Sequence, residues 1–120
     1  MSRILLVDNE PDVIDALRAS LEVEGHHVLT ALDGCEAFEV VTGRIPDLVV
    51  TDWKMPHVDG LALCRLLREN RFSVRLPVIV MSADPPPTDR RLVLYNAYIR
   101  KPVSVQEVLA LVSSLTQSQH

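Results

Sequence analysis

The sequence predicts an α/β protein, in which a doubly wound parallel sheet of five strands carries helices on both faces. Short, continuous apolar runs, typical of strands covered on both faces, alternate along the chain with longer segments of helical character. The links between these segments are short and the chain contains no internal repeat. Successive parallel strands are therefore expected to be joined by right-handed helical crossovers.

The first 60 residues contain three predicted strands and two predicted helices. Pro11 suits the first position of a helix, and the periodic apolar segment that it opens ends before Gly25. Asp33 is a residue type that caps the start of a helix. The predicted elements are a strand over 4–7, a helix over 11–24, a strand over 27–30, a helix over 33–42 and a strand over 47–51 that ends at Asp52.

The second half is predicted to complete the sheet with two more strands. Proline donates no backbone hydrogen bond, so the triplet Pro85, Pro86 and Pro87 should leave only a short fourth helix that begins near Thr88. A polar tail from about residue 117 is expected to fray. The other predicted elements are a helix over 61–70, strands over 77–81 and 97–100, and an amphipathic last helix that starts near 104.

Length and composition indicate one domain spanning residues 1–120. The chain is 48% apolar, so it can bury one hydrophobic core, and its formal net charge of −4 argues against nucleic acid as a direct partner. Four arginines at helical spacing lack interleaved aromatic residues and are interpreted as a solvated helix face: Arg65, Arg68, Arg71 and Arg75. No apolar run is long enough to span a membrane and no signal-peptide pattern opens the chain, so we expect a cytoplasmic protein.

Polar side chains follow four of the predicted strands at the point where each strand ends. Asp8 and Asn9 follow the first strand, Asp52 ends the third, Ser82 ends the fourth and Lys101 follows the fifth. Each of these alone has a commonplace explanation as a helix cap or a solvated side chain. Because ligands bind beyond the carboxyl ends of the strands in open parallel sheets, their agreement predicts a single site.

The residue types at these strand ends suit phosphoryl transfer. Carboxylates together with an amide or carbonyl oxygen form the hard oxygen site that Mg²⁺ prefers. A lysine and a hydroxyl bind the oxygens of a phosphoryl group. Asp52 would then attack phosphorus, with Lys101 and the metal ion neutralising the developing charge, and the product would be an aspartyl phosphate.

Over essentially its whole length the chain resembles a response-regulator receiver domain of the CheY-like kind. The motifs occur in the family's order and near its spacing; they are Val7-Asp8-Asn9-Glu10, Thr51-Asp52-Trp53-Lys54-Met55-Pro56 with Asp59-Gly60, Val80-Met81-Ser82-Ala83, and Tyr98-Ile99-Arg100-Lys101-Pro102. The resemblance implies a flavodoxin-like strand order of 2-1-3-4-5. It also implies a two-component phosphorelay, in which a histidine kinase or phosphotransfer protein donates the phosphoryl group.

The resemblance also assigns expected roles to individual residues. Asp52 resembles the phosphoacceptor, and Lys101 resembles the phosphate-binding lysine, which in the family is commonly followed by a cis proline, here Pro102. Ser82 resembles a hydroxyl that acts both in catalysis and in switching, and Tyr98 resembles the switch aromatic. Phosphorylation is expected to shift an existing conformational equilibrium and so to change a protein-interaction surface.

The expected Mg²⁺ ligands are Asp8, Asn9, Asp52 and the backbone carbonyl of Lys54. Receivers usually carry a second acidic residue where this chain has Asn9. An amide oxygen still coordinates a metal ion, but the lost charge should weaken binding. Glu10 is a possible substitute ligand if its side chain turns inward. The sequence leaves open whether Asn9 weakens or abolishes metal binding.

Lys54 and Asp84 lie two residues beyond the expected phosphoacceptor and the expected switch hydroxyl. We hypothesise that they pair across the mouth of the pocket, obstruct attacking water and lengthen the life of the phosphoryl group. The alternative is an exposed ion pair that contributes little.

Two classes of function remain in competition. The first is a phosphorylated receiver that is not an enzyme, because it promotes only its own phosphorylation and dephosphorylation, and that acts on a downstream protein or effector domain. The second is a receiver-like module that docks partners without phosphorylation. In both cases we expect a monomer or weak dimer that contacts neither nucleic acid nor membrane. The sequence does not distinguish a stand-alone receiver from part of a longer regulator.

Overall fold

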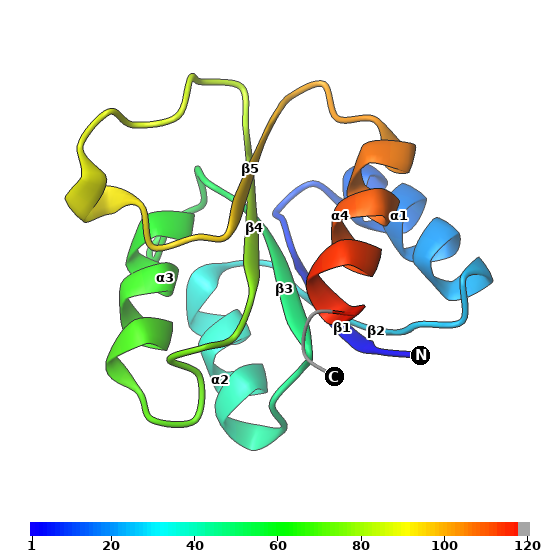
Figure 1. Ribbon diagram of the computed structural model, residues 1–120, viewed down its shortest axis with the longest axis horizontal. Helices are drawn as coiled ribbons and strands as arrows, with labels where there is room; N and C mark the ends of the chain where they lie inside the picture. Colours follow the sequence, from blue (N-terminus) through cyan, green and yellow to red (C-terminus); the bar gives the residue numbers. More distant parts are fainter. Residues whose placement is uncertain (118–120) are drawn as a thin grey trace.

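The computed structural model describes residues 1–117 and contains one parallel sheet of five strands in the order β2-β1-β3-β4-β5 (Figure 1). The fold class and strand order agree with the prediction. In chain order the elements are β1 (Arg3–Val7), α1 (Pro11–Val23), β2 (His27–Ala31), α2 (Gly34–Gly43), β3 (Leu48–Asp52), α3 (Gly60–Glu69), β4 (Val78–Ser82), the 3₁₀ turn η1 (Arg90–Leu92), β5 (Ala97–Arg100) and α4 (Val105–Gln117).

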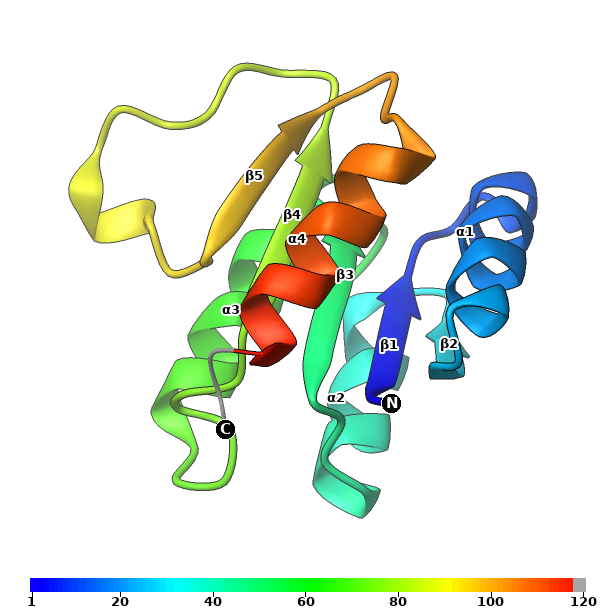
Figure 2. The same ribbon diagram turned by 45° about the vertical axis from the view of Figure 1, so that its right-hand side comes forward.

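Helices cover both faces of the sheet, which explains why its strands are continuous apolar runs. Helices α1 and α4 lie on one face, and α2 and α3 lie on the other (Figures 1 and 2). Side chains alternate between two hydrophobic clusters because successive strand residues point to opposite faces. Within β3, for example, Leu48 and Val50 join the cluster under α1 and α4, whereas Val49 joins the cluster under α2 and α3.

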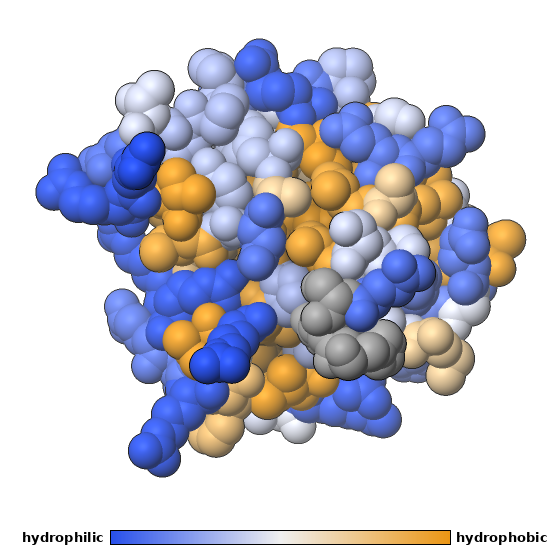
Figure 3. All heavy atoms as spheres, in the orientation of Figure 1, coloured by the Kyte–Doolittle hydropathy of each residue, from blue (hydrophilic) through white to orange (hydrophobic). Residues whose placement is uncertain are grey.

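The predicted short fourth helix is present only as a single 3₁₀ turn. The segment between β4 and β5 contains only the 3₁₀ turn η1, in which the Asp89 side chain accepts a hydrogen bond from the Arg91 N–H. The three prolines occupy the first part of the connection, and by Leu94 the chain is already held by Arg68, whose Nε donates to the Leu94 carbonyl at 2.9 Å. Only residues 88–93 lie between the prolines and Leu94, and three of them form η1. The η1 segment projects from the molecule with hydrophilic side chains at its tip (Figure 3).

The interpretation of the four arginines as a solvated helix face holds only for Arg65, because Arg71 and Arg75 lie beyond the end of α3 and Arg68 is partly buried. Arg65, Arg71 and Arg75 are exposed, but Arg68 is partly buried and donates hydrogen bonds to carbonyl oxygens of the following loop. The predicted fraying of the tail concerns residues beyond 117, which lie outside the described part of the chain. Across residues 1–117, no helix is both long and apolar enough to cross a membrane.

Candidate functional site

Two carboxylates and one ammonium group meet at the carboxyl ends of the strands. Asp8 directly follows β1, Asp52 ends β3, and Lys101 directly follows β5. Lys101 Nζ lies 3.3 Å from Asp52 Oδ2 and 3.6 Å from Asp8 Oδ2. Both aspartates are buried, while Lys101 is partly exposed. The structure therefore brings together three of the side chains that the sequence analysis assigned to one site.

Strand register explains why the two carboxylates are neighbours. Val7 of β1 lies opposite Thr51 of β3, so the next residues, Asp8 and Asp52, share a level and a face of the sheet. Two adjacent carboxylates repel each other, and burial deprives each of hydration. Burial first and the charge of Asp8 second raise the pKa of the Asp52 carboxyl above its usual range, although Lys101 opposes the shift.

The two carboxylates stabilise the charged form of Lys101. Partial burial on its own lowers the pKa of its ammonium group, but attraction to Asp52 and Asp8 outweighs burial and leaves the pKa raised. Lys101 is therefore a fixed positive charge at neutral pH. One such charge against two ionised carboxylates leaves a net negative charge in the pocket, which a bound cation would neutralise.

The oxygens of the pocket fit a divalent cation such as Mg²⁺. Asp8 Oδ1 accepts a hydrogen bond from the Glu10 N–H at 2.9 Å, but Asp8 Oδ2 is buried and accepts no hydrogen bond, and its ion-pair contact with Lys101 Nζ is long, at 3.6 Å. An unsatisfied buried carboxylate oxygen is costly, and a metal ion is one of the few groups that relieves it. Asp52 supplies a second carboxylate beside it, and both are the hard ligands that Mg²⁺ requires.

The remaining expected metal ligands belong to exposed residues. Asn9, Glu10 and Lys54 are all exposed, and Asn9 adjoins Asp8 in the chain. Nowhere in residues 1–117 do three His, Cys, Asp or Glu side chains gather closely enough to hold a metal ion. A divalent cation bound at this site would therefore meet two carboxylates, with neutral oxygens completing its coordination.

Ser82 ends the strand that adjoins the phosphoacceptor candidate. Asp52 lies opposite Met81, so Ser82 stands one residue further along β4, where it is buried. Its Oγ accepts a hydrogen bond from the Asp84 N–H at 3.1 Å, and its carbonyl accepts one from the Lys101 N–H at 2.8 Å. The peptide bond after Lys101 is cis. The backbone thus ties the serine to both the lysine and the rim of the pocket.

The rim of the pocket is organised around Asp84, which the sequence analysis identified only as a pairing partner. Lys54 Nζ lies 2.7 Å from Asp84 Oδ2, so the hypothesised pair is present, with both side chains more than half exposed. Tyr98 donates from its hydroxyl to the Asp84 carbonyl at 2.8 Å, and its ring meets Trp53 edge-on. Through its N–H, carbonyl and carboxylate, Asp84 therefore links Ser82, Tyr98 and Lys54.

A glycine permits the close approach of α3 to the phosphoacceptor segment. A Cβ on Gly60 would lie 2.6 Å from the Asp52 carbonyl oxygen and 3.0 Å from the Trp53 Cα. The Gly60 N–H donates to the Trp53 carbonyl at 2.7 Å, and Asp59 caps the helix by accepting from the Ala62 N–H at 2.8 Å. The start of α3 therefore holds the end of β3 in place.

Known proteins have sequences similar to this chain. The family model described as "Response regulator receiver domain" matches residues 4–113. The phosphate regulon transcriptional regulatory protein PhoB of Rhizobium meliloti (strain 1021) is 36% identical over 118 residues, which are 96% of this chain and 52% of that protein. Response regulator MprA of Mycobacterium leprae (strain TN) is 39% identical over 116 residues, 94% of this chain and 50% of that protein. The chain spans about half the length of these relatives.

Solved structures show the same fold. The receiver domain of Francisella response regulator 1452 superposes with a TM-score of 0.91 at 27% identity, covering 100% of both chains. The receiver domain of the sensor histidine kinase PA1611 from Pseudomonas aeruginosa PAO1, described with a magnesium ion coordinated in its active-site cleft, has a TM-score of 0.86 at 26% identity. That match covers 97% of this chain and 98% of the other.

Proposed function

Because this chain belongs to the response-regulator receiver domain family of two-component signalling, we propose that it accepts a phosphoryl group on Asp52 from a histidine kinase or phosphotransfer protein. The observation that supports this most directly is the contact of Lys101 Nζ with the buried carboxylates of Asp52 and Asp8, at 3.3 and 3.6 Å. A carboxylate nucleophile beside a fixed cation is the arrangement that in-line attack on phosphorus requires.

In the proposed reaction an oxygen of Asp52 forms a bond to the phosphorus of a phosphohistidine. The phosphorus–nitrogen bond breaks, and the electron pair leaves with the imidazole of the donor. Lys101 stabilises the negative charge that accumulates on the phosphoryl oxygens, and the hydroxyl of Ser82 turns to donate a hydrogen bond to one of them. The product is an aspartyl phosphate.

Mg²⁺ is the cofactor that this proposal implies. Asp8 and Asp52 would hold it, with Asn9 and the Lys54 carbonyl completing the set, and the ion would supply additional positive charge against the phosphoryl oxygens. Asp8 contributes most because its Oδ2 already lacks a hydrogen-bond partner. With Asn9 in place of a carboxylate, the apparent affinity for Mg²⁺ should be lower than that of a site with three carboxylates.

We also propose that the chain acts on no separate substrate and is not an enzyme in that sense. It would promote only its own phosphorylation and dephosphorylation, and its output would be a changed surface offered to a downstream protein or effector domain. The contacts of Asp84 suggest how the signal leaves the pocket. When Ser82 turns toward the phosphoryl group, its bond to the Asp84 N–H is disturbed, and Asp84 in turn anchors the Tyr98 hydroxyl.

Incubation with acetyl phosphate and Mg²⁺ tests this proposal. Intact mass spectrometry should show the addition of one phosphoryl group to the wild-type chain and none to Asp52→Asn, because the amide is not a nucleophile toward phosphorus. Chelation of Mg²⁺ should suppress the addition to the wild type. A wild-type chain that gains no mass while it remains folded would favour the competing function, a module that docks partners without phosphorylation.

The Lys54–Asp84 pair leads to a prediction about the lifetime of the phosphoryl group. The hydrogen bond between the two side chains, together with the attraction between their charges, raises the pKa of Lys54 and lowers the pKa of Asp84. Exposed ion pairs are weak, so Lys54→Ala should speed dephosphorylation only modestly, by up to about fivefold. The measurement is the decay of the phosphorylated mass with time.

Two further variants identify the cause of that change. Asp84→Asn removes the ion pair but keeps the backbone contacts to Ser82 and Tyr98, so it should accelerate decay as much as Lys54→Ala does. Lys54→Arg retains the pair and should decay as the wild type does. Identical decay in all four proteins would show that the pair does not obstruct water.

A further inference from the structure

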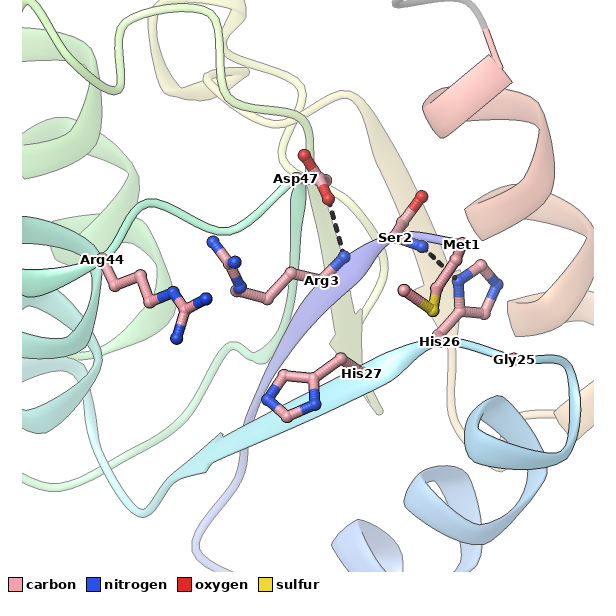
Figure 4. A pocket seen from close by; sticks show the side chains of 8 residues that line it. All are labelled: Met1, Ser2, Arg3, Gly25, His26, His27, Arg44 and Asp47. Carbon is pink, nitrogen blue, oxygen red and sulfur yellow. Dashed lines mark hydrogen bonds between the residues drawn. The ribbon is translucent and has the colours of Figure 1, made fainter.

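A second hollow lies at the opposite edge of the sheet, where the strands begin. Figure 4 shows the side chains of Arg3, His27 and Arg44 around it. Its volume is about 470 Å³, which is within the range of small-molecule sites. We call it the basic hollow, after these three residues. The basic hollow is separate from the phosphoacceptor pocket, which lies at the carboxyl ends of the strands.

Three different elements bring these side chains together. Arg3 of β1 and His27 of β2 are register partners on adjacent parallel strands, so their side chains share a face of the sheet. That face is the one covered by α2, because Leu5 and Val7 of the same strand join the cluster under α2 and α3. Arg44 directly follows the last residue of α2. The three groups therefore converge by virtue of the fold.

The basic hollow holds an excess of positive charge. Within residues 1–117, no carboxylate lies at ion-pair distance from the side chains of Arg3, His27 or Arg44. Among the described residues, Asp47 is the one acidic residue that lines the hollow, and its Oδ2 accepts the Arg3 backbone N–H at 2.6 Å. The Arg3 guanidinium donates to the Ile45 carbonyl through Nη1 at 3.1 Å, which leaves other N–H groups for a ligand.

We propose that the basic hollow binds the phosphate group of a small, soluble phosphate ester. The guanidinium groups of Arg3 and Arg44 both line the hollow and carry like charges, and an anion bound between them would lower their mutual repulsion. Guanidinium forks match the spacing of phosphate oxygens, and a tetrahedral dianion accepts hydrogen bonds from several directions at once, whereas a carboxylate offers only two oxygens in one plane. The volume exceeds that of phosphate alone and leaves room for the organic part of the ester.

An NMR titration of the full chain with glycerol 3-phosphate, without Mg²⁺ and at constant ionic strength, tests this inference. The backbone amide signals of Arg3, His27 and Ile45 should shift and saturate. Arg44→Gln should weaken binding by about tenfold or more, equivalent to the loss of one charged hydrogen bond. The matched control is Arg65→Gln, at another exposed arginine, on α3, and this variant should bind as the wild type does. Arg44 is exposed, so its replacement leaves the core intact.

Four outcomes would overturn the inference. In the first, the shifts centre on Ser82 and Lys101, which would place the phosphate in the phosphoacceptor pocket. In the second, Arg44→Gln and Arg65→Gln bind alike, which would mean general attraction to surface charge. In the third, acetate at the same ionic strength binds as tightly as glycerol 3-phosphate, which would contradict selection of a tetrahedral dianion. Absence of saturable shifts would also refute the site.

Discussion

Gly60→Ala should destabilise the protein by about 3 kcal/mol, a typical cost of forcing atoms into a well-packed interior. The added Cβ would lie 2.6 Å from the Asp52 carbonyl oxygen and 3.0 Å from the Trp53 Cα. Both are backbone atoms at the end of β3, so the clash is not relieved by rotating a side chain. Either α3 moves outward or the phosphoacceptor segment moves with its carboxylate.

The same substitution should slow phosphorylation, because Asp52 must stay aligned with Lys101 and the incoming phosphorus. Displacement of a reacting group by about 1 Å can cost about a hundredfold in rate, and we expect a loss of this order in the acetyl phosphate reaction. Chemical denaturation measures the first effect, and the rate of mass gain under native conditions measures the second.

Gly43→Ala is the matched control. Gly43 is the last residue of α2, and a Cβ there would meet no heavy atom within 4 Å. Alanine is a better helix former than glycine, so this variant should be neutral or more stable by up to about 1 kcal/mol, with an unchanged phosphorylation rate. If both glycine variants had wild-type stability, the close approach of α3 to β3 would not constrain the site.

The main elements were predictable because they depend on local pattern. Asp33 and Asp59 occupy helix N-cap positions, where each accepts a backbone hydrogen bond, and the buried strands read as apolar runs. The convergence of Asp8, Asp52 and Lys101 was also predictable, because parallel strands place their carboxyl ends at one edge of the sheet. The Asp59-Gly60 pair was visible in the sequence. The structure shows why the second residue is glycine: it lies against the Asp52 carbonyl, a contact between separate elements that no local pattern reveals.

The features that the sequence did not predict depend on contacts between distant residues. The three prolines predicted a short fourth helix, but no local pattern indicated that Arg68 donates a hydrogen bond to the Leu94 carbonyl. Arg3, His27 and Arg44 lie far apart in sequence, and no spacing rule groups them. Arg68 belongs to a periodic row of arginines, and only the structure shows that it turns inward while its neighbours face solvent.

Arg68→Met should cost about 3–4 kcal/mol of stability, a large share of the total for a domain of this size. Arg68 donates to the carbonyls of Ser73, Val74 and Leu76 through Nη1, with Leu76 the closest at 2.7 Å. Its other nitrogens reach the Leu94 carbonyl and the side chain of Asn96. The guanidinium thus fastens the loop after α3 to the segment that enters β5.

The charge of Arg68 is stabilised by these carbonyl dipoles rather than by a carboxylate. Burial lowers the pKa of its guanidinium, but an arginine remains charged at any pH at which the protein is folded. Methionine keeps the apolar stem and provides no donor, so several carbonyls would lose their partner in a partly buried place. The cost should be independent of pH between about 5 and 9 and should lower the melting temperature by about 10–15 °C.

Arg65→Met on the same helix controls for the loss of one positive charge, because Arg65 is exposed, and it should change stability by less than about 0.5 kcal/mol. The stability of Arg68→Lys should fall between those of the two methionine variants, because one ammonium group cannot reach carbonyls on both the loop and the β5 segment.

Hydrogen exchange locates the effect. The Val78 N–H, which donates to the Asn96 side chain at 2.9 Å, should lose protection in Arg68→Met more than amides of β1 do. Equal melting temperatures for Arg68→Met and Arg65→Met would mean that the carbonyls are satisfied without the guanidinium, and that the approach to Tyr98 is held by the sheet alone.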